Sequence, residues 1–223
     1  VFALAPFTRV AAALGRMVAS GEVLRAALGT LGIAAEGYLL ATVLGILGGF
    51  ATGMSAVARN TLDPIVNALY TAPMTLLIPV IGIWIGLGTR GKLFLVFMFS
   101  VFVILVNTAA GVRSVDPGLV ETARSFGARR LKLYRDVLLP WSLPFILTGM
   151  RLGVGRAIRG AIVADMLLIS GNLGRFLLEA GSTYRMDVLL AGILFTMLLG
   201  YGLMALARWL ESRALRWRPV QRW

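Results

Sequence analysis

The chain has 223 residues, of which 58% are hydrophobic and only 14% charged, and its mean hydropathy is +0.84. Soluble domains are about half apolar and about one quarter charged, so the composition excludes an ordinary water-soluble globule. Lys and Arg number 22 against 10 Asp and Glu, a formal net charge of +12. Because this surplus accompanies long uncharged runs, it is typical of a membrane protein with a basic cytoplasmic side rather than of a nucleic-acid-binding protein.

The chain contains no Cys and no His. The absence of Cys excludes disulfides, thiol nucleophiles and thiolate metal sites. The absence of His excludes the hydrolytic triads and zinc sites that depend on imidazole. A mechanism built on Asp, Glu, Lys or Tyr stays open, and no metal site is expected.

In chain order, residues 1–29 form an amphipathic stretch without a signal-peptide pattern. A helix needs about 20 mostly apolar residues to cross the hydrocarbon, and four uncharged segments further along meet this length. A fifth segment contains Arg and Asp residues, and we expect its first half to run near the cytoplasmic interface before its second half crosses. The five expected spans are Gly37–Ala58, Ile65–Gly88, Leu93–Val112, Trp141–Ser170 and Val188–Ala207.

These segments predict an all-α fold, a polytopic membrane helix bundle with about five transmembrane helices in a single domain over residues 1–223. Within the first span, we expect a row of glycines to allow close helix packing: Gly45, Gly48, Gly49 and Gly53. The predicted layout is an amphipathic segment at 1–29, three spans over 30–112, a cytoplasmic loop at 113–140, two spans over 141–210 and a basic tail at 211–223.

The second span contains two prolines, which we expect to break backbone hydrogen bonds at membrane depth. Such breaks persist only where protein, side chains or water satisfy the backbone again. This span is therefore our candidate for lining a translocation pathway, and a kinked packing helix is the alternative. The candidate pathway residues are Thr71, Pro73, Thr75, Pro79 and Trp84, together with Asn107 and Asp165 from later spans.

Asp165 is an ionisable residue within a predicted span. Such a residue is costly in lipid and faces a partner or a cavity. Three interpretations stay open: Asp165 lies on the substrate path, it forms a structural pair with an Arg of a neighbouring helix, or it lies near the outer interface.

The distribution of basic residues predicts the orientation. If every span crosses, 12 basic residues fall on one side and 7 on the other, with 3 inside the fourth predicted span. The side with 12 should be cytoplasmic. Five crossings then place residue 1 outside, and together with the starting Val1 this leads us to expect a further span before residue 1.

The polar segment from Ser114 to Pro144 carries strong helix signals. Asp116 and Pro117 form a good helix start, an acidic cap followed by a proline that needs no amide donor. We expect this helix to run to about Phe126 and to end at Gly127, which tolerates a left-handed conformation.

A second amphipathic helix should follow, with Leu131, Tyr134 and Leu138 on one face. Pro140 and Pro144 should then break or redirect the chain. The segment is thus predicted to be a cytoplasmic helix-turn-helix that acts as a docking element.

The spacing of residues in this loop resembles the cytoplasmic signature of the permeases of ABC importers. Glu121-Thr122-Ala123, Gly127 and Val137-Leu138-Leu139-Pro140 match that signature at every spacing, with Thr122 in place of Ala and Val137 in place of Ile. The resemblance implies that the short helix inserts into a groove of an ATPase subunit. The residues implied for this coupling are Glu121, Thr122, Ala123, Gly127, Val137, Leu139 and Pro140.

Further segments resemble the nitrate, sulfonate and taurine branch of that family, in which Glu usually stands at the place of Asp165. They are Leu62–Pro64, Ala72-Pro73, Pro79, Trp84–Gly88, Asn107–Arg113, Leu147–Leu152 and Ala164–Met166. The resemblance implies a type I importer fold, a multi-pass position in the bacterial inner membrane and a small, anionic solute as substrate.

The same resemblance implies the partners. They are a cytoplasmic ATP-binding subunit, an extracytoplasmic solute-binding protein and a second permease subunit in a homodimer. The permease itself would be non-catalytic and would hold no cofactor, since the ATPase partner uses ATP. Membrane lipid is the remaining partner, and no nucleic acid is expected.

Alternatives stay open at this point. The basic cluster from Arg124 to Arg135 is better explained by loop topology and contact with anionic lipid headgroups than by pairing of each Arg with an ATPase. A secondary transporter or channel is the rival function, although we find no repeated half with corresponding broken helices. A membrane-embedded enzyme with an Asp-based site is a third possibility.

Overall fold

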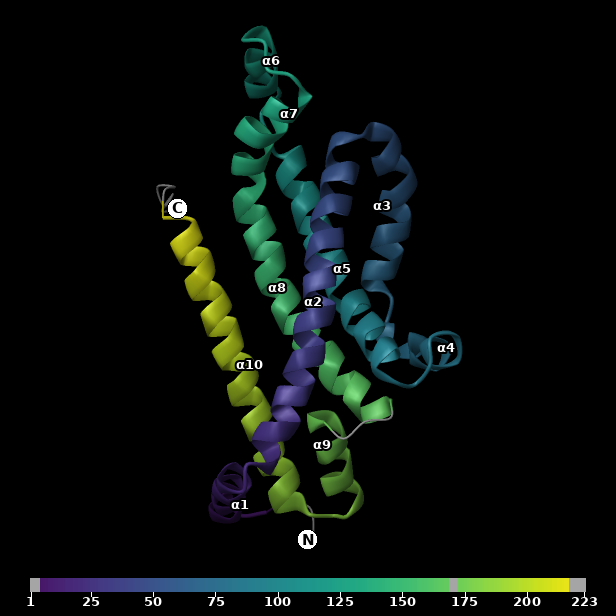
Figure 1. The fold of residues 1–223 in the computed structure, drawn as a ribbon, viewed down its shortest axis with the longest axis vertical. Coiled ribbons are helices and arrows are strands. Elements are labelled where there is room, and N and C mark those ends of the chain that lie inside the picture. Colours follow the sequence, from purple (N-terminus) through teal and green to yellow (C-terminus); the bar gives the residue numbers. More distant parts are fainter. Residues whose placement is uncertain (1–4, 169–171, 217–223) are drawn as a thin grey trace. The chain divides into compact units, whose positions relative to one another are not determined.

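The computed structural model describes residues 5–168 and 172–216, and every regular element in that part of the chain is helical (Figure 1). The all-α prediction is confirmed. The elements are α1 (Phe7–Ala19), α2 (Glu22–Met54), α3 (Ala56–Thr71), η1 (Met74–Leu77), α4 (Ile78–Trp84), α5 (Thr89–Arg113), α6 (Pro117–Ser125), α7 (Arg130–Leu133), η2 (Tyr134–Leu138), α8 (Leu139–Leu167), α9 (Leu173–Ser182) and α10 (Met186–Ala214).

The chain divides into two compact units, each built from three separate stretches of sequence. Unit 1 comprises Val1–Leu39, Pro73–Phe99 and Val154–Leu206, and unit 2 comprises Leu40–Ala72, Ser100–Gly153 and Ala207–Trp223. The long helices α2, α5, α8 and α10 each contribute residues to both units.

Four helical runs are long and apolar enough to cross a membrane: Glu22–Met54, Thr89–Arg113, Leu131–Leu167 and Met186–Ala214. A fifth span is counted if the bent pair Ala56–Thr71 and Met74–Trp84 is taken as one crossing. The prediction of about five spans is therefore confirmed. Of the fourth predicted span, residues 169 and 170 lie outside the described residues.

The first predicted span has different ends in the structure. Its helix, α2, begins at Glu22 instead of Gly37 and ends at Met54. Ser55 has extended backbone angles, and its Oγ accepts a hydrogen bond from the Ala58 amide at 3.2 Å. Ser55 is thus the N-cap of a new helix, and the chain reverses direction there (Figure 1).

The second predicted span is not a single kinked helix. Helix α3 ends at Thr71, and the helical part that follows, Met74–Trp84, is separate from it. Ala72 is extended, with ψ of 138°, because a residue that precedes proline is disfavoured in helical conformation. Pro79 lies in the first turn of α4, where no amide donor is needed. The interruption of this span therefore lies at Ala72 and Pro73, and Pro79 begins the next helix.

Pro140 and Pro144 also differ from expectation, because the helix neither breaks nor changes into another conformation at either of them. Both lie in the continuous helical run from Leu131 to Leu167. A π-helical turn, η2, comes directly before α8, and the Leu139 amide bonds to the Tyr134 carbonyl across it. Helices form such a wider turn where the regular series of backbone hydrogen bonds, each four residues apart, is interrupted.

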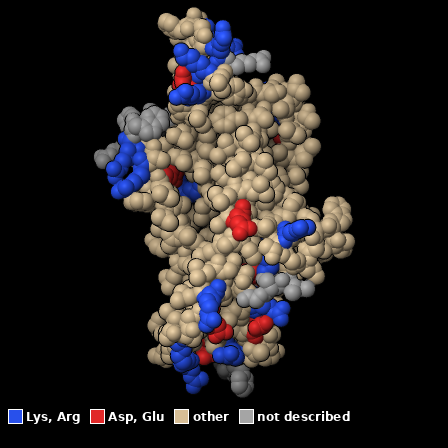
Figure 2. Space-filling view, viewed as in Figure 1, with Lys and Arg blue, Asp and Glu red and all other residues tan. Residues whose placement is uncertain are grey.

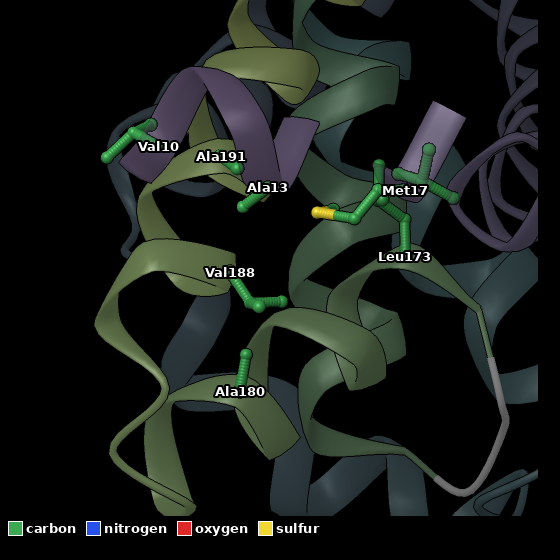
Figure 3. Packing of buried hydrophobic residues seen from close by; sticks show 8 residues of the cluster. Val10, Ala13, Met17, Leu173, Ala180, Val188 and Ala191 are labelled. Carbon is green, nitrogen blue, oxygen red and sulfur yellow. The ribbon is translucent and has the colours of Figure 1, made fainter. Parts of the chain in front are cut away.

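Unit 1 has a core formed by α1, α9 and the start of α10. Val10, Ala13 and Met17 lie on one face of α1 at helical spacing and are all buried, so the amphipathic character predicted within residues 1–29 is confirmed. Figure 3 shows this face against residues of α9 and α10. The buried cluster comprises Val10, Ala13, Met17, Val23, Leu173, Ala180, Val188 and Ala191.

In unit 2, α2 and α5 pack closely where α2 carries glycines. A Cβ atom added at Gly49 would lie 2.5 Å from the Thr108 Cβ, and one added at Gly53 would lie 2.7 Å from the Val112 Cβ. These distances are shorter than any ordinary contact between carbon atoms. The predicted role of these glycines in close helix packing is confirmed.

Candidate functional site

Helix α6 of unit 2 begins as its sequence predicts. Asp116 is extended, and its Oδ1 accepts a hydrogen bond from the Gly118 amide at 2.8 Å. Pro117 occupies the first helical position. This pair satisfies the exposed amide end of a helix that is only nine residues long.

The carboxyl end of α6 is closed by a Schellman motif. Gly127 has φ of 78°, a left-handed conformation that glycine adopts without strain. The Ala128 amide bonds to the Ala123 carbonyl at 3.0 Å, and the Gly127 amide bonds to the Arg124 carbonyl at 2.8 Å. The predicted helix end at Gly127 is confirmed.

One face of α6 is attached to the rest of unit 2. Val120 and Ala123 pack against a buried cluster of Val115, Leu133 and Leu138, so α6 is held against the elements that precede and follow it. Phe50, Val137 and Trp141 pack against the same cluster.

The other face of α6 is open. Glu121 and Thr122 are exposed, and the Thr122 hydroxyl donates to the Gly118 carbonyl at 2.7 Å. Within the part of the chain that the structure describes, the Glu121 carboxylate forms no ion pair. Its negative charge is thus available to a partner.

Two large apolar side chains of the same loop are almost fully exposed. Phe126 is 88% exposed and Leu131 is 81% exposed. The sequence predicts Leu131, Tyr134 and Leu138 on one helix face, but Leu138 is buried together with Leu133, whereas Leu131 and Tyr134 are exposed. The π-helical turn after Leu133 changes the helical phase, so the spacing of a regular helix does not apply across it. Phe126 is not among the residues that the sequence predicts for coupling, because no local pattern shows that its side chain is exposed.

The remaining loop residues of the predicted coupling set lie where η2 joins α8. Val137 is half-buried, Leu139 is 43% exposed, and Pro140 is half-buried. The Trp141 Nε1 donates to the Ser114 carbonyl at 3.1 Å, which connects the start of α8 to the end of α5.

Basic side chains surround this loop. Arg124, Arg129, Lys132 and Arg135 are all exposed, and Figure 2 shows Lys and Arg gathered over α6 and α7. At the end of α5, Arg113 pairs with Asp63 of α3 at 2.8 Å.

The candidate pathway residues are divided between the two units. Thr71 and Asn107 belong to unit 2, where each side chain donates to a backbone carbonyl of its own helix, at 3.0 Å for Thr71 to Asn67 and at 2.7 Å for Asn107 to Val103. The others, Pro73, Thr75, Pro79, Trp84 and Asp165, belong to unit 1.

Within unit 1, short α4 has both buried and exposed side chains. Ile78 and Ile81 pack against Ala164 of α8 and against Leu168, which comes directly after α8. In the same helix Trp84 is 82% exposed and Pro79 is exposed, as is Thr75 of the preceding η1. Asp165 is only 1% exposed, so it does not share the open surface of α4.

Asp165 lies in a buried polar cluster instead. Its Oδ1 accepts hydrogen bonds from the Lys92 Nζ and, at 3.3 Å, from the Asn172 Nδ2. Its Oδ2 accepts from the Thr30 hydroxyl at 2.6 Å, and the same hydroxyl accepts from the Leu173 amide at 3.1 Å. The ionic partner of Asp165 in unit 1 is thus Lys92, whereas the structural alternative predicted from the sequence was an Arg.

Comparison with known proteins agrees with these features. The family described as binding-protein-dependent transport system inner membrane component matches residues 41–216. A putative ABC transporter permease protein of Methanocaldococcus jannaschii is 33% identical over 188 residues, which covers 84% of this chain and 70% of that protein. The taurine transport system permease protein TauC of Escherichia coli is 35% identical over 172 residues, which covers 75% of this chain and 62% of that protein.

The fold also matches solved structures. An inward-facing structure of the MetNI methionine ABC transporter superposes with a TM-score of 0.74 at 20% identity, covering 87% of this chain and 95% of that chain. The chain spans 70% and 62% of the length of the two relatives above. The long apolar helices, the capped loop helix and these similarities lead to one conclusion. The chain belongs to the family of binding-protein-dependent transport system inner membrane components, the permease subunits of ABC transporters.

Proposed function

We propose that this chain is the membrane-spanning subunit of an ATP-driven importer and that α6 docks onto a separate cytoplasmic ATP-binding subunit. The observation that carries the proposal is the geometry of α6. Both of its ends are capped, one face is held by the buried cluster, and the face with Glu121 is open. A short helix ordered in this way is already shaped for a partner, so binding costs little ordering entropy.

The open side of this loop combines the two kinds of group that dominate protein interfaces. Phe126 and Leu131 supply apolar area, and Glu121 supplies a charge that orients the contact. Both side chains are almost fully exposed and would bury apolar area if a partner covered them. We therefore add Phe126 and Leu131 to the coupling residues Glu121, Thr122, Ala123, Gly127, Val137, Leu139 and Pro140.

The proposed mechanism is a coupled conformational change. The ATP-binding subunits use ATP, and this chain needs no cofactor of its own. Because α6 is attached through Leu133 and Leu138 to the start of α8, a push on α6 is passed to that membrane helix. The change requires only that the inward-open and outward-open states bind the partners with different affinity.

We propose a second copy of the chain and an extracytoplasmic solute-binding protein as further partners. The substrate would be a small anion such as taurine, another sulfonate or nitrate, and similarity to the taurine permease supports this class. Calorimetric titration of the cognate binding protein with these anions tests the assignment. Binding of an uncharged or cationic solute alone would contradict it.

The pathway is proposed to include Thr71, Pro73, Thr75, Pro79, Trp84 and Asn107. The natural chain has no Cys, so single Cys variants can be labelled without background. We expect Thr75→Cys and Trp84→Cys to react with a membrane-impermeant thiol reagent and to be protected by substrate. Ser100→Cys, at a side chain that is fully buried, is the control. Labelling that substrate does not change would remove these positions from the pathway.

The docking proposal is tested with Glu121→Arg. The full-length protein, tagged and purified from membranes of its own organism, should retain an ATPase, and Glu121→Arg should abolish both this retention and ATP-dependent uptake. Asp136→Arg is the matched control, since Asp136 is an exposed carboxylate of the same loop. Unimpaired uptake by Glu121→Arg would refute docking through α6, as would equal losses in the two variants.

A further inference from the structure

We propose that unit 2 contains a binding site for an anionic phospholipid. One acyl chain would lie along α2, and the phosphate would lie against Arg124 of α6. Three observations within unit 2 lead to this site: a hollow beside α6, an apolar stripe that runs into it, and a basic end without acidic residues.

The hollow has a volume of about 740 Å³ and is formed by the end of α2, the start of α3, α6 and the turn between α7 and α8. Its apolar wall includes Leu47, Phe50 and Met54. Its polar groups are those of Ser55, Arg124 and Tyr134. A space that is apolar on one side and polar on the other fits an amphiphile better than a water-soluble ion.

The apolar wall continues along α2 as a stripe of exposed side chains. Leu40, Leu44, Leu47, Ala51 and Met54 follow one another at steps of four and three residues, which places them on one helix face. Leu40 is 51% exposed, Leu44 45% and Leu47 61%. At about 1.5 Å per residue the stripe is about 21 Å long, whereas one leaflet contributes about 15 Å of hydrocarbon. The stripe is therefore long enough for the whole of one acyl chain to lie along it.

The polar end of the hollow matches a phosphate. No residue that lines it is acidic, and no described acidic side chain pairs with Arg124. A guanidinium binds phosphate oxygens through two parallel hydrogen bonds. The Ser55 Oγ accepts from the Ala58 amide, so its own proton is free to be donated, and the Tyr134 hydroxyl provides another donor. Basic pockets on the cytoplasmic side of membrane helices select anionic headgroups.

A lipid in this place would connect α6 to the α2–α3 corner. Arg124 lies one turn after Glu121 on α6, so its phosphate contact would orient the same helix that carries the proposed docking face. The site thus provides a route by which the content of anionic lipid affects coupling. Lipid binding itself needs no ATPase, so its test is independent of the proposed function.

The test uses the full-length protein purified in detergent and incubated with equal amounts of phosphatidylglycerol and phosphatidylcholine with identical acyl chains. Native mass spectrometry measures the retained lipid. We expect preferential retention of phosphatidylglycerol, and about a fivefold loss in Arg124→Gln, the effect of one basic contact near a membrane surface. Arg129→Gln is the matched control, because Arg129 is an exposed arginine of the same loop outside the hollow. Ala51→Trp, which fills the stripe, should reduce retention of both lipids.

Three results would overturn the proposal. One is equal retention of the two lipids by the natural protein, and another is an equal loss in Arg124→Gln and Arg129→Gln, which would indicate unspecific surface charge. The third is a disulfide-linked dimer of Leu47→Cys without bound lipid, which would show that a second copy covers the stripe. If Arg124→Gln does not fold, Tyr134→Phe, which removes one hydroxyl, should still reduce the preference for phosphatidylglycerol, and an unchanged preference would overturn the site.

Discussion

Lys92 and Asp165 form an ion pair across 73 residues of sequence, and each side chain is only 1% exposed. The pair joins the first turn of α5 to the last turn of α8 within unit 1. Through Thr30, Asp165 also connects to α2 and to the first amide of α9. The carboxylate is thus fully supplied with hydrogen-bond donors, which is the condition under which a buried charge is tolerated.

We expect this pair to be sensitive to the loss of one partner. Lys92→Met and Asp165→Leu should each destabilise the protein by about 3–5 kcal/mol, because each leaves an uncompensated buried charge. The double variant Lys92→Met/Asp165→Leu should recover much of that loss. Thermal unfolding in detergent, followed by intrinsic fluorescence, measures the three variants. A double variant as unstable as the sum of the single ones would show that the two charges do not depend on each other.

Gly174 lies beside the same cluster and should not tolerate a side chain. A Cβ added there would lie 2.3 Å from the Ile162 carbonyl oxygen and 2.7 Å from the Asp165 Cβ. Gly174→Ala should therefore destabilise unit 1 by about 1–3 kcal/mol through overpacking. Gly200→Ala is the control, since nothing lies within 4 Å of a Cβ at that helical position. The same thermal measurement should show Gly200→Ala unchanged or slightly stabilised, and similar losses in both would contradict the close approach.

Gly127 should be replaceable by Asn better than by Ala. A residue with a side chain at its φ of 78° loses about 1–2 kcal/mol of conformational free energy. The loss is smaller for Asn, because Asn adopts the left-handed conformation more readily. If α6 docks as proposed, Gly127→Ala should reduce the amount of ATPase that co-purifies, and Gly127→Asn should restore part of it. Equal amounts of bound ATPase in Gly127→Ala and the natural protein would show that this helix end does not affect docking.

The ion pair between Arg113 and Asp63 should matter much less for stability than the buried one. The two side chains are 32% and 26% exposed at a distance of 2.8 Å, so solvent screens part of their attraction. Asp63→Asn should cost about 1 kcal/mol or less in thermal unfolding. The loss should shrink at high salt, whereas that of Asp165→Leu should not. A loss from Asp63→Asn as large as that from Asp165→Leu would mean that this pair is shielded from solvent.

The loop shows how much of a site local sequence can predict. Asp116, Pro117 and Gly127 act through their own backbone and nearest neighbours, and for this reason both ends of α6 lie where their residue types indicate. Phe126 was missed because its exposure depends on what packs against the loop. Leu131, Tyr134 and Leu138 do not form the single face that a regular helical period predicts, because a π-helical turn begins at Tyr134.

Helix α9 was also missed, although a signal was present. Leu173, Leu177 and Ala180 are buried at helical spacing, but the segment is too short for a membrane span and lies between two longer apolar runs. A helix of this length therefore does not meet the length criterion for a membrane span. Its apolar face is what closes the core with α1 and α10.

By itself, the sequence determined the all-α membrane class, the approximate number of membrane spans and the capped loop helix with Glu121. These features depend on composition and on patterns within one or two helical turns, so they can be read along the chain. Only the tertiary structure decided that Asp165 pairs with Lys92, that a break separates α3 from α4, and that Phe126 and Leu131 are exposed. The ion pair depends on residues far apart in sequence, and the exposure of a side chain depends on whether other elements pack against it. A local sequence pattern contains neither kind of information.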